Sequence, residues 1–246
     1  MNVPMATQDI PYVDTKQMIE VDRAMMEDYR IDLIQMMENA GHNLAHLARA
    51  RFLNGDPRGQ KIVVLAGTGG NGGGALVCAR RLHNYGADVH VFITKPDADF
   101  APVPGHQLDI VRRMGVPVAL AGQVDGEETA DLIIDGIIGY SLKGSPRGTA
   151  ATLVQWANSQ LAPILALDAP SGLDTTSGTV FEPTIQAIAT MTLALPKAGL
   201  LAENVARQVG ELYLADISVP PALYANQALK IAVGPIFAAS DIVRIR

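Results

Sequence analysis

Near the start of the chain, apolar residues recur every three or four positions, and this spacing predicts helices. The first apolar stripe consists of Met18, Val21, Met25 and Tyr29. Asp32 can cap a second helix, because Gln35 three residues later completes a capping-box pattern. Residues 15–53 are therefore expected to form N-terminal helices. Their methionine-rich stripe predicts either packing in the core or the contact surface of a homodimer.

From Lys61 onward, short aliphatic and β-branched runs alternate with helical stretches. The runs predict strands at 62–66, 89–93, 116–120, 132–134, 164–167, 191–195 and 212–215. Helices are predicted between several of these strands, at 75–85, 105–114 and 149–158. Continuous apolar strands separated by helices are typical of a parallel sheet covered on both faces.

The pattern as a whole predicts an α/β fold. We expect a Rossmann-like three-layer αβα sandwich with a mostly parallel sheet and an N-terminal helical extension. We interpret 1–246 as a single domain with its doubly wound core over 61–215. A loop-rich C-terminal extension over 216–246 follows, with a weak last strand near 231–233.

Composition and charge exclude several classes of protein. With 48% apolar and 18% charged residues, the chain is not disordered as a whole. A net charge of −6 with no basic run argues against nucleic acid as the main partner. The longest uncharged run, 148–167, contains several polar residues and a proline, so no membrane span is expected. One cysteine and no recognisable secretory signal favour a cytoplasmic protein.

Glycine is concentrated directly after the first predicted strand. Six of the eight residues from Gly67 to Gly74 are glycine, and Gly67, Gly69 and Gly72 form a GxGxxG pattern. Such a loop is either a tight turn or an anion site at a helix N-terminus. The second strand ends at Ile93-Thr94-Lys95, without the acidic residue that binds ribose in NAD dehydrogenases. The loop is therefore compatible with phosphate but is not a standard dinucleotide fingerprint.

Two further strands end in carboxylates, at the edge of an α/β sheet where ligands bind. Asp135 ends the fourth strand and can hold a cation, while Lys143 in the following loop can reach a phosphate. Asp168 ends the fifth strand, where partial burial tends to raise a carboxyl pKa and suits it to proton transfer. Ser171 adds an oxygen ligand suited to a hard cation. The alternative is that both aspartates only cap turns.

Five segments, in order, resemble the motifs of one family, the YjeF N-terminal domain or NAD(P)H-hydrate epimerases. The segments are Met37-Glu38-Asn39-Ala40-Gly41, the glycine loop at 67–74, Asp131–Gly139, the Asp168-Ala169-Pro170-Ser171-Gly172-Leu173-Asp174 loop and Pro196-Lys197-Ala198-Gly199-Leu200. The resemblance extends from about residue 17 to residue 215.

The resemblance implies a specific activity. Family members interconvert the R and S epimers of hydrated NADH and NADPH, and a dehydratase, expected on a separate chain, then repairs the S form. It also implies a potassium ion, with Asn71, Asp135 and Ser171 as ligands, and Asp168 as the substrate-contacting acid/base. The matching substrate-contacting loops are Gly70, Asn71, Gly72, Gly73 and Gly74, and Gly139, Tyr140, Ser141, Leu142, Lys143, Gly144 and Ser145.

This sequence departs from the family pattern in the glycine loop. The family's first Asn is replaced here by Gly70, and its Asp is replaced by Gly74. Two hypotheses follow. The chain is an epimerase that uses Asp168, or it is a non-catalytic module that still binds a nucleotide or related metabolite.

Overall fold

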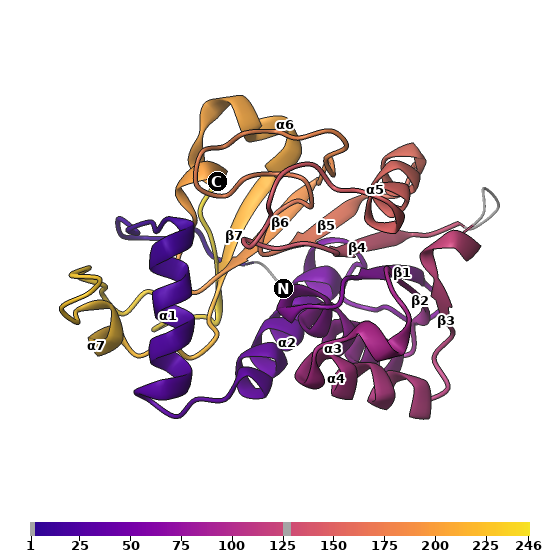
Figure 1. Cartoon of the computed structure of the whole chain (residues 1–246), viewed down its shortest axis with the longest axis horizontal. Coiled ribbons are helices and arrows are strands. Elements are labelled where there is room, and N and C mark those ends of the chain that lie inside the picture. The colour runs from indigo at the N-terminus through magenta and orange to yellow at the C-terminus, as the bar shows by residue number, and fades with distance from the viewer. Residues whose placement is uncertain (1–2, 125–128) are drawn as a thin grey trace.

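The computed structural model describes residues 3–124 and 129–246, and a single sheet runs through their centre. The sheet has eight strands in the order β3-β2-β1-β4-β5-β6-β7-β8 (Figure 1). Strands β1 to β7 are parallel, and β8 pairs antiparallel with β7. The strands are β1 (Lys61–Ala66), β2 (Asp88–Ile93), β3 (Val118–Leu120), β4 (Leu132–Gly136), β5 (Ile164–Leu167), β6 (Ala189–Leu193), β7 (Glu211–Ala215) and β8 (Ile242–Arg244). This arrangement confirms the predicted α/β fold.

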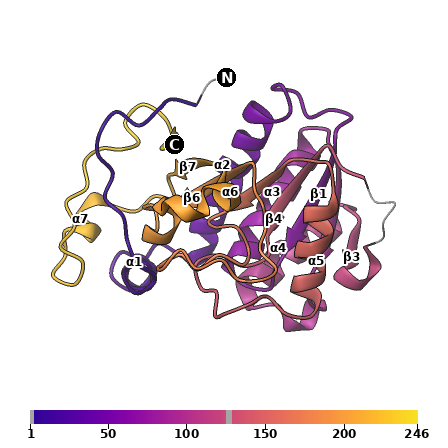
Figure 2. The ribbon, with the colours of Figure 1, turned by 90° about the horizontal axis from the view of Figure 1, so that it is seen from above.

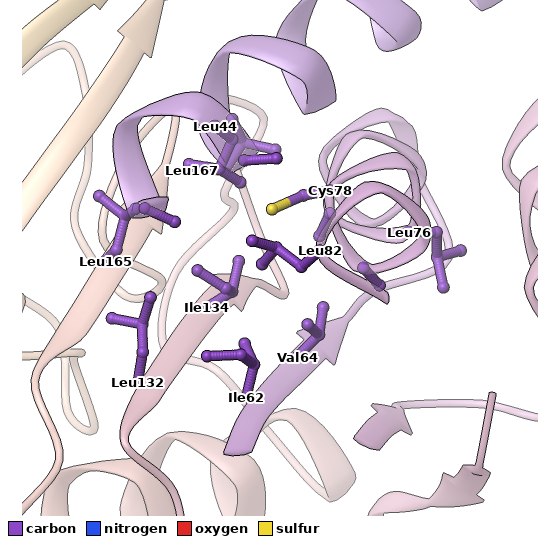
Figure 3. Packing of buried hydrophobic residues seen from close by; sticks show 14 of the residues in the cluster. Leu44, Ile62, Val64, Leu76, Cys78, Leu82, Leu132, Ile134, Leu165 and Leu167 are labelled. Atoms are coloured by element: carbon purple, nitrogen blue, oxygen red, sulfur yellow. The ribbon is translucent and has the colours of Figure 1, made fainter. Parts of the chain in front are cut away.

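Helices cover both faces of the sheet, as the continuous apolar strands require. They are α1 (Thr15–Glu27), α2 (Leu33–Arg51), α3 (Gly70–Asn84), α4 (Pro102–Arg113), α5 (Thr149–Ser159), α6 (Ala206–Val209) and α7 (Pro221–Tyr224). Successive side chains of a strand point to opposite faces. Ile62 and Val64 of β1 therefore pack against α2 and α3 (Figure 3), while Val63 and Leu65 pack against α5 on the other face.

Three members of the predicted stripe, Met18, Val21 and Met25, lie on α1 and are buried, whereas Tyr29 lies beyond the helix and is 41% exposed. Met18 and Met25 are 2% and 0% exposed, and they pack on α7 and on the segment that follows β6. Asp14 caps the helix in a capping box with Gln17. In two views α1 lies beside the β6–β7 end of the sheet (Figures 1 and 2). The buried part of the stripe therefore serves core packing. It gives no support to a homodimer, which stays a prediction.

Several bounds differ from the prediction, among them the start of β3 at Val118 instead of 116 and the start of α4 at Pro102 instead of 105. Helix α3 begins at Gly70, and the expected start at 75 is wrong because the low helix propensity of glycine hides the first turn. Strand β6 ends at Leu193, because Ala194 has a φ of 64° and turns the chain away. The strand predicted near 231–233 is wrong. That segment packs against α1 and α7, and β8 takes the sheet edge.

Within residues 3–124 and 129–246, no helix combines the length and apolar character needed to cross a membrane.

Candidate functional site

A cavity of about 480 Å³ opens at the carboxyl ends of the strands, where the strand order reverses between β1 and β4. Ligands bind at this switch point in open α/β sheets. The cavity lies between α1 and α2 on one side and the loops after β1, β4, β5 and β6 on the other. Its predicted site residues are Gly70, Asn71, Gly74, Gly139, Tyr140, Ser141 and Asp168.

The glycine loop turns directly into α3 because its backbone segments touch. A Cβ at Gly72 would lie 1.8 Å from the backbone oxygen of Gly67, so only glycine fits there. Gly70 and Asn71 begin the helix at the cavity, where unpaired N–H groups of a first turn attract an anion. Gly72 and Gly73 are buried behind this turn and do not line the cavity.

The two departures from the family pattern leave different amounts of room. A Cβ at Gly70 would come no closer than 3.9 Å, to Cε of Met37, so the space there is open. A Cβ at Gly74 would lie 2.8 Å from Cδ2 of Leu167. Beside Gly74 the cavity wall is therefore apolar, formed by Ala40 and Leu167.

Asp168 is held by two bonds at the end of β5. Its Oδ1 lies 2.5 Å from Nζ of Lys197, and its Oδ2 accepts a 2.9 Å bond from the backbone N–H of Tyr140. The residue has a φ of 64°, a left-handed conformation that is rare outside glycine and clusters at functional sites. Asp168 is 4% exposed and still lines the cavity, so the structure places this carboxylate as predicted.

Sequence reasoning missed the role of Lys197. The side chain is fully buried, and besides Asp168 it donates to the carbonyl oxygen of Leu193 at 2.9 Å and to Oγ1 of Thr192 at 3.3 Å. Buried charges in proteins are paired and hydrogen-bonded, and Lys197 satisfies both conditions. A lysine in an otherwise apolar segment, Ala194-Leu195-Pro196-Lys197-Ala198-Gly199-Leu200, was the available signal.

Asp135 and Ser171 form a buried oxygen cluster beside the cavity. The Ser171 hydroxyl donates to Oδ1 of Asp135 at 2.6 Å, and the Ser171 N–H donates to Oδ2 at 2.8 Å. Asp135 is fully buried, and in the described part of the chain neither lysine nor arginine pairs with it. Burial raises the pKa of Asp135 to about 6. A cation beside it would supply the missing positive charge.

The side chain of Asn71 lies beside Gly139, and its backbone oxygen lies beside Gly136, the residue after Asp135. A Cβ at Gly139 would lie 3.2 Å from Cγ of Asn71 and 2.9 Å from Oδ2 of Asp168. Because Gly139 has no side chain, the side chains of Asn71 and Asp168 can both lie close to its backbone. The Nδ2 of Asn71 is buried and has no hydrogen-bond partner in the described structure. An unpaired buried amide N–H of this kind calls for a hydrogen-bond acceptor, from a bound ligand or from a water molecule.

The rest of the predicted loop lies outside the cavity. Leu142, Lys143, Gly144 and Ser145 do not line it, and the side chain of Lys143 is exposed. A residue that was not predicted does line it. Asp22 of α1 accepts a 2.5 Å hydrogen bond from the Tyr140 hydroxyl.

Comparison with known proteins identifies a family that the chain matches. Residues 33–199 match the model of the family described as YjeF-related protein N-terminus. The chain belongs to the YjeF N-terminal family. The matched residues include the glycine loop, Asp135, Asp168 and Lys197, whereas α1 lies before the match.

Relatives of this YjeF N-terminal chain carry informative names. It is 41% identical to a protein of Dehalogenimonas lykanthroporepellens named NAD(P)H-hydrate epimerase, over 97% of this chain and 94% of that protein. It is 36% identical to a Moorella thermoacetica protein named bifunctional NAD(P)H-hydrate repair enzyme Nnr, over 87% of this chain but 42% of that protein. The crystal structure of yeast YNL200c aligns with a TM-score of 0.78 at 26% identity, covering 96% of this chain and 100% of the yeast chain.

Proposed function

We propose that this chain is an NAD(P)H-hydrate epimerase, an isomerase that interconverts the R and S forms of hydrated NADH and NADPH. The observation that carries the proposal is the position of the Asp168 carboxylate. It is held by buried Lys197, and it lines a cavity that the N-terminus of α3 also lines. Similarity to proteins named for this activity, over nearly the whole chain in one case, supports the same assignment.

The chemistry of the substrate fits these groups. Hydration of the dihydronicotinamide ring places a hydroxyl on the carbon next to the ring nitrogen. Inversion requires that this hydroxyl leaves as water and that water returns to the other side of the ring. Asp168 exchanges the proton at the hydroxyl oxygen, and Lys197 keeps the carboxylate oriented. The first turn of α3 at Gly70 and Asn71 binds a phosphate oxygen of the dinucleotide.

We further propose a potassium ion beside Asp135, held by oxygens of Asn71, Asp135 and Ser171. The donor set fits, since all three side chains offer oxygen and Asp135 is a fully buried carboxylate without a basic partner in the described structure. A bound ion would balance the charge of Asp135 and would supply positive charge for a phosphate of the substrate.

The potassium proposal has a test that does not depend on activity. A ligand that binds only the folded state raises the melting temperature. KCl should raise it more than NaCl or choline chloride at equal ionic strength, and Asp135→Asn should remove the difference. Asp131→Asn, an exposed change before the opposite end of β4 that keeps a hydrogen-bond acceptor, should retain it. Equal melting temperatures in the three salts would refute the site.

A second function keeps the cavity without catalysis. Gly74 leaves an apolar wall where the family pattern has a carboxylate, and a pocket of this kind could serve only to bind a nucleotide or related metabolite. Calorimetry that detects binding of hydrated NADH by a protein without turnover would favour this alternative.

The epimerase assay decides between the two. R-hydrated NADH is mixed with the protein and an excess of an S-specific dehydratase, and recovery of NADH is followed by absorbance. We expect recovery well above the rate without protein, and loss of the increase in Asp168→Asn. Asp174→Asn, at an exposed turn in the same motif, is the matched control. A rate equal to that without protein would refute the epimerase.

The biological setting is also a proposal. We infer a cytoplasmic protein that acts beside a dehydratase, and a homodimer stays a prediction that the buried stripe does not support. Light scattering during gel filtration tests the dimer, and a monomeric mass would contradict it.

A further inference from the structure

A second carboxyl group faces the cavity from α1. Asp22 is held by the Tyr140 hydroxyl at 2.5 Å, and both residues line the cavity. Tyr140 also donates its backbone N–H to Oδ2 of Asp168 at 2.9 Å. One tyrosine thus connects two carboxyl groups, with Asp168 at its backbone and Asp22 at the tip of its ring. Lys197 Nζ lies 5.9 Å from the centre of that ring.

The environments of the two carboxyl groups differ. Asp168 has a cation in direct contact, whereas the direct partner of Asp22 is the neutral hydroxyl of Tyr140. Burial raises the pKa of Asp22, although the hydrogen bond from Tyr140 and the charge of Lys197 oppose that shift. Asp168 and Tyr224 also face Asp22 from the elements packed around it. Two carboxyl groups with such different partners in one cavity are a usual arrangement for a separate acid and base.

We propose that Asp22, together with Tyr140, is a second catalytic acid/base group that serves one face of the substrate ring while Asp168 serves the other. The proposal rests on the epimerase function and adds residues to it. Asp22 reaches the cavity from α1 and Asp168 reaches it from the end of β5, so a ring bound between these two elements would have one carboxyl group on each side. Inversion at a sugar carbon follows the same logic, with an acid on one face and a base on the opposite face.

The proposed step balances as follows. The C–O bond breaks as the hydroxyl takes a proton from Asp22 and leaves as water, while the lone pair of the ring nitrogen forms a C=N bond. A water molecule then adds to the same carbon from the other face and gives its proton to Asp168, and the C=N electron pair returns to nitrogen. In the reverse direction Asp168 is the acid and Asp22 the base. Water in the open cavity restores the two protonation states between turnovers.

The test separates inversion from oxygen exchange. Each epimer is incubated with enzyme in ¹⁸O-labelled water, the epimers are separated by chromatography, and both inversion and ¹⁸O content are measured. In the wild type, label enters as the epimers interconvert. In Asp22→Asn, inversion should fall by about 10²-fold or more. One epimer, the one whose hydroxyl faces Asp168, should still exchange its oxygen with its configuration retained.

Two controls and a second variant accompany the test. Tyr140→Phe removes the hydroxyl that holds Asp22. It should also raise the ratio of oxygen exchange to inversion, by a smaller factor than Asp22→Asn does. Asp14→Asn makes the same chemical change at the cap of the same helix, where asparagine caps equally well, and should leave both rates unchanged. Tyr12→Phe is the matched change at an exposed tyrosine.

Each outcome decides the proposal. Retained exchange in one epimer with lost inversion supports it. If inversion and exchange fall in parallel in both variants, Asp22 only shapes the cavity and the proposal is refuted. If Asp22→Asn inverts the substrate at the wild-type rate, the proposal is also refuted while the epimerase function stands. A wild type that inverts neither epimer refutes both.

Discussion

Replacing Lys197 by methionine should reveal how strongly the site is held by one ion pair. Methionine has a similar length, so the change removes the charge and its three hydrogen bonds with little change in packing. Asp168, 4% exposed, then loses its cation while the carboxylate stays buried. Breaking a buried pair in this way costs about 3–5 kcal/mol. For a chain of this size each kcal/mol lowers the melting temperature by about 2–4 °C, so a decrease of roughly 6–20 °C is expected.

A double-mutant cycle separates the pair from simple loss of packing. Asp168→Asn keeps the shape of the side chain, and asparagine tolerates the left-handed backbone at this position. The free energy of unfolding is measured by urea denaturation for the wild type, both single variants and Asp168→Asn with Lys197→Met. We expect the double variant to lose about 2–3 kcal/mol less than the sum of the single losses, since the two groups interact directly. Additive losses, or a loss below about 1 kcal/mol in Lys197→Met, would refute the reasoning.

Four further substitutions test the cavity. Gly72→Ala places a Cβ 1.8 Å from a backbone oxygen, so it should destabilise the protein by about 3 kcal/mol or more in urea denaturation, and a loss under 1 kcal/mol would contradict this. Gly74→Asp should lower the free energy of unfolding by about 1–3 kcal/mol, because its Cβ would contact Leu167. Gly70→Asn places its side chain in open space, so it should lower the free energy of unfolding less. Burial raises the pKa of Asp22, so the folded state binds its proton more tightly and this contribution to stability falls as pH rises from about 4 through the folded pKa. Asp22→Asn should therefore be more stable relative to wild type at pH 7 than at pH 4, and a difference that does not change with pH would contradict the sign.

The sheet and one half of the site follow from local sequence. Runs such as 62–66 and 164–167 are apolar and uninterrupted, so they predict buried parallel strands within a residue or two of the observed bounds. A parallel sheet in turn fixes where strand ends meet. Asp135 and Asp168 could therefore be placed at one edge before any coordinates were known.

The other half of the site depends on contacts between distant parts of the chain. Lys197 and Asp22 pair with Asp168 and Tyr140, and nothing in the local pattern specifies those partners. Asp22 lies four residues after Met18 and three before Met25, at the edge of the buried stripe of α1, where a carboxylate ordinarily turns toward solvent. Only the packing of α1 against the last third of the chain places this edge of the helix at a cavity.

The segment before α1 is joined to the far end of the site by backbone hydrogen bonds. The N–H of Val13 donates to the carbonyl oxygen of Pro196 at 2.9 Å, and the N–H of Ala198 donates back to Val13 at 2.9 Å. Val13 is synthesised early and Pro196 late, so these hydrogen bonds beside α1 cannot form until most of the chain has been synthesised. Domains fold as units during synthesis. Nascent chains released before residue 196 should therefore have no competent site, and protection of the cavity against proteolysis should develop late in translation.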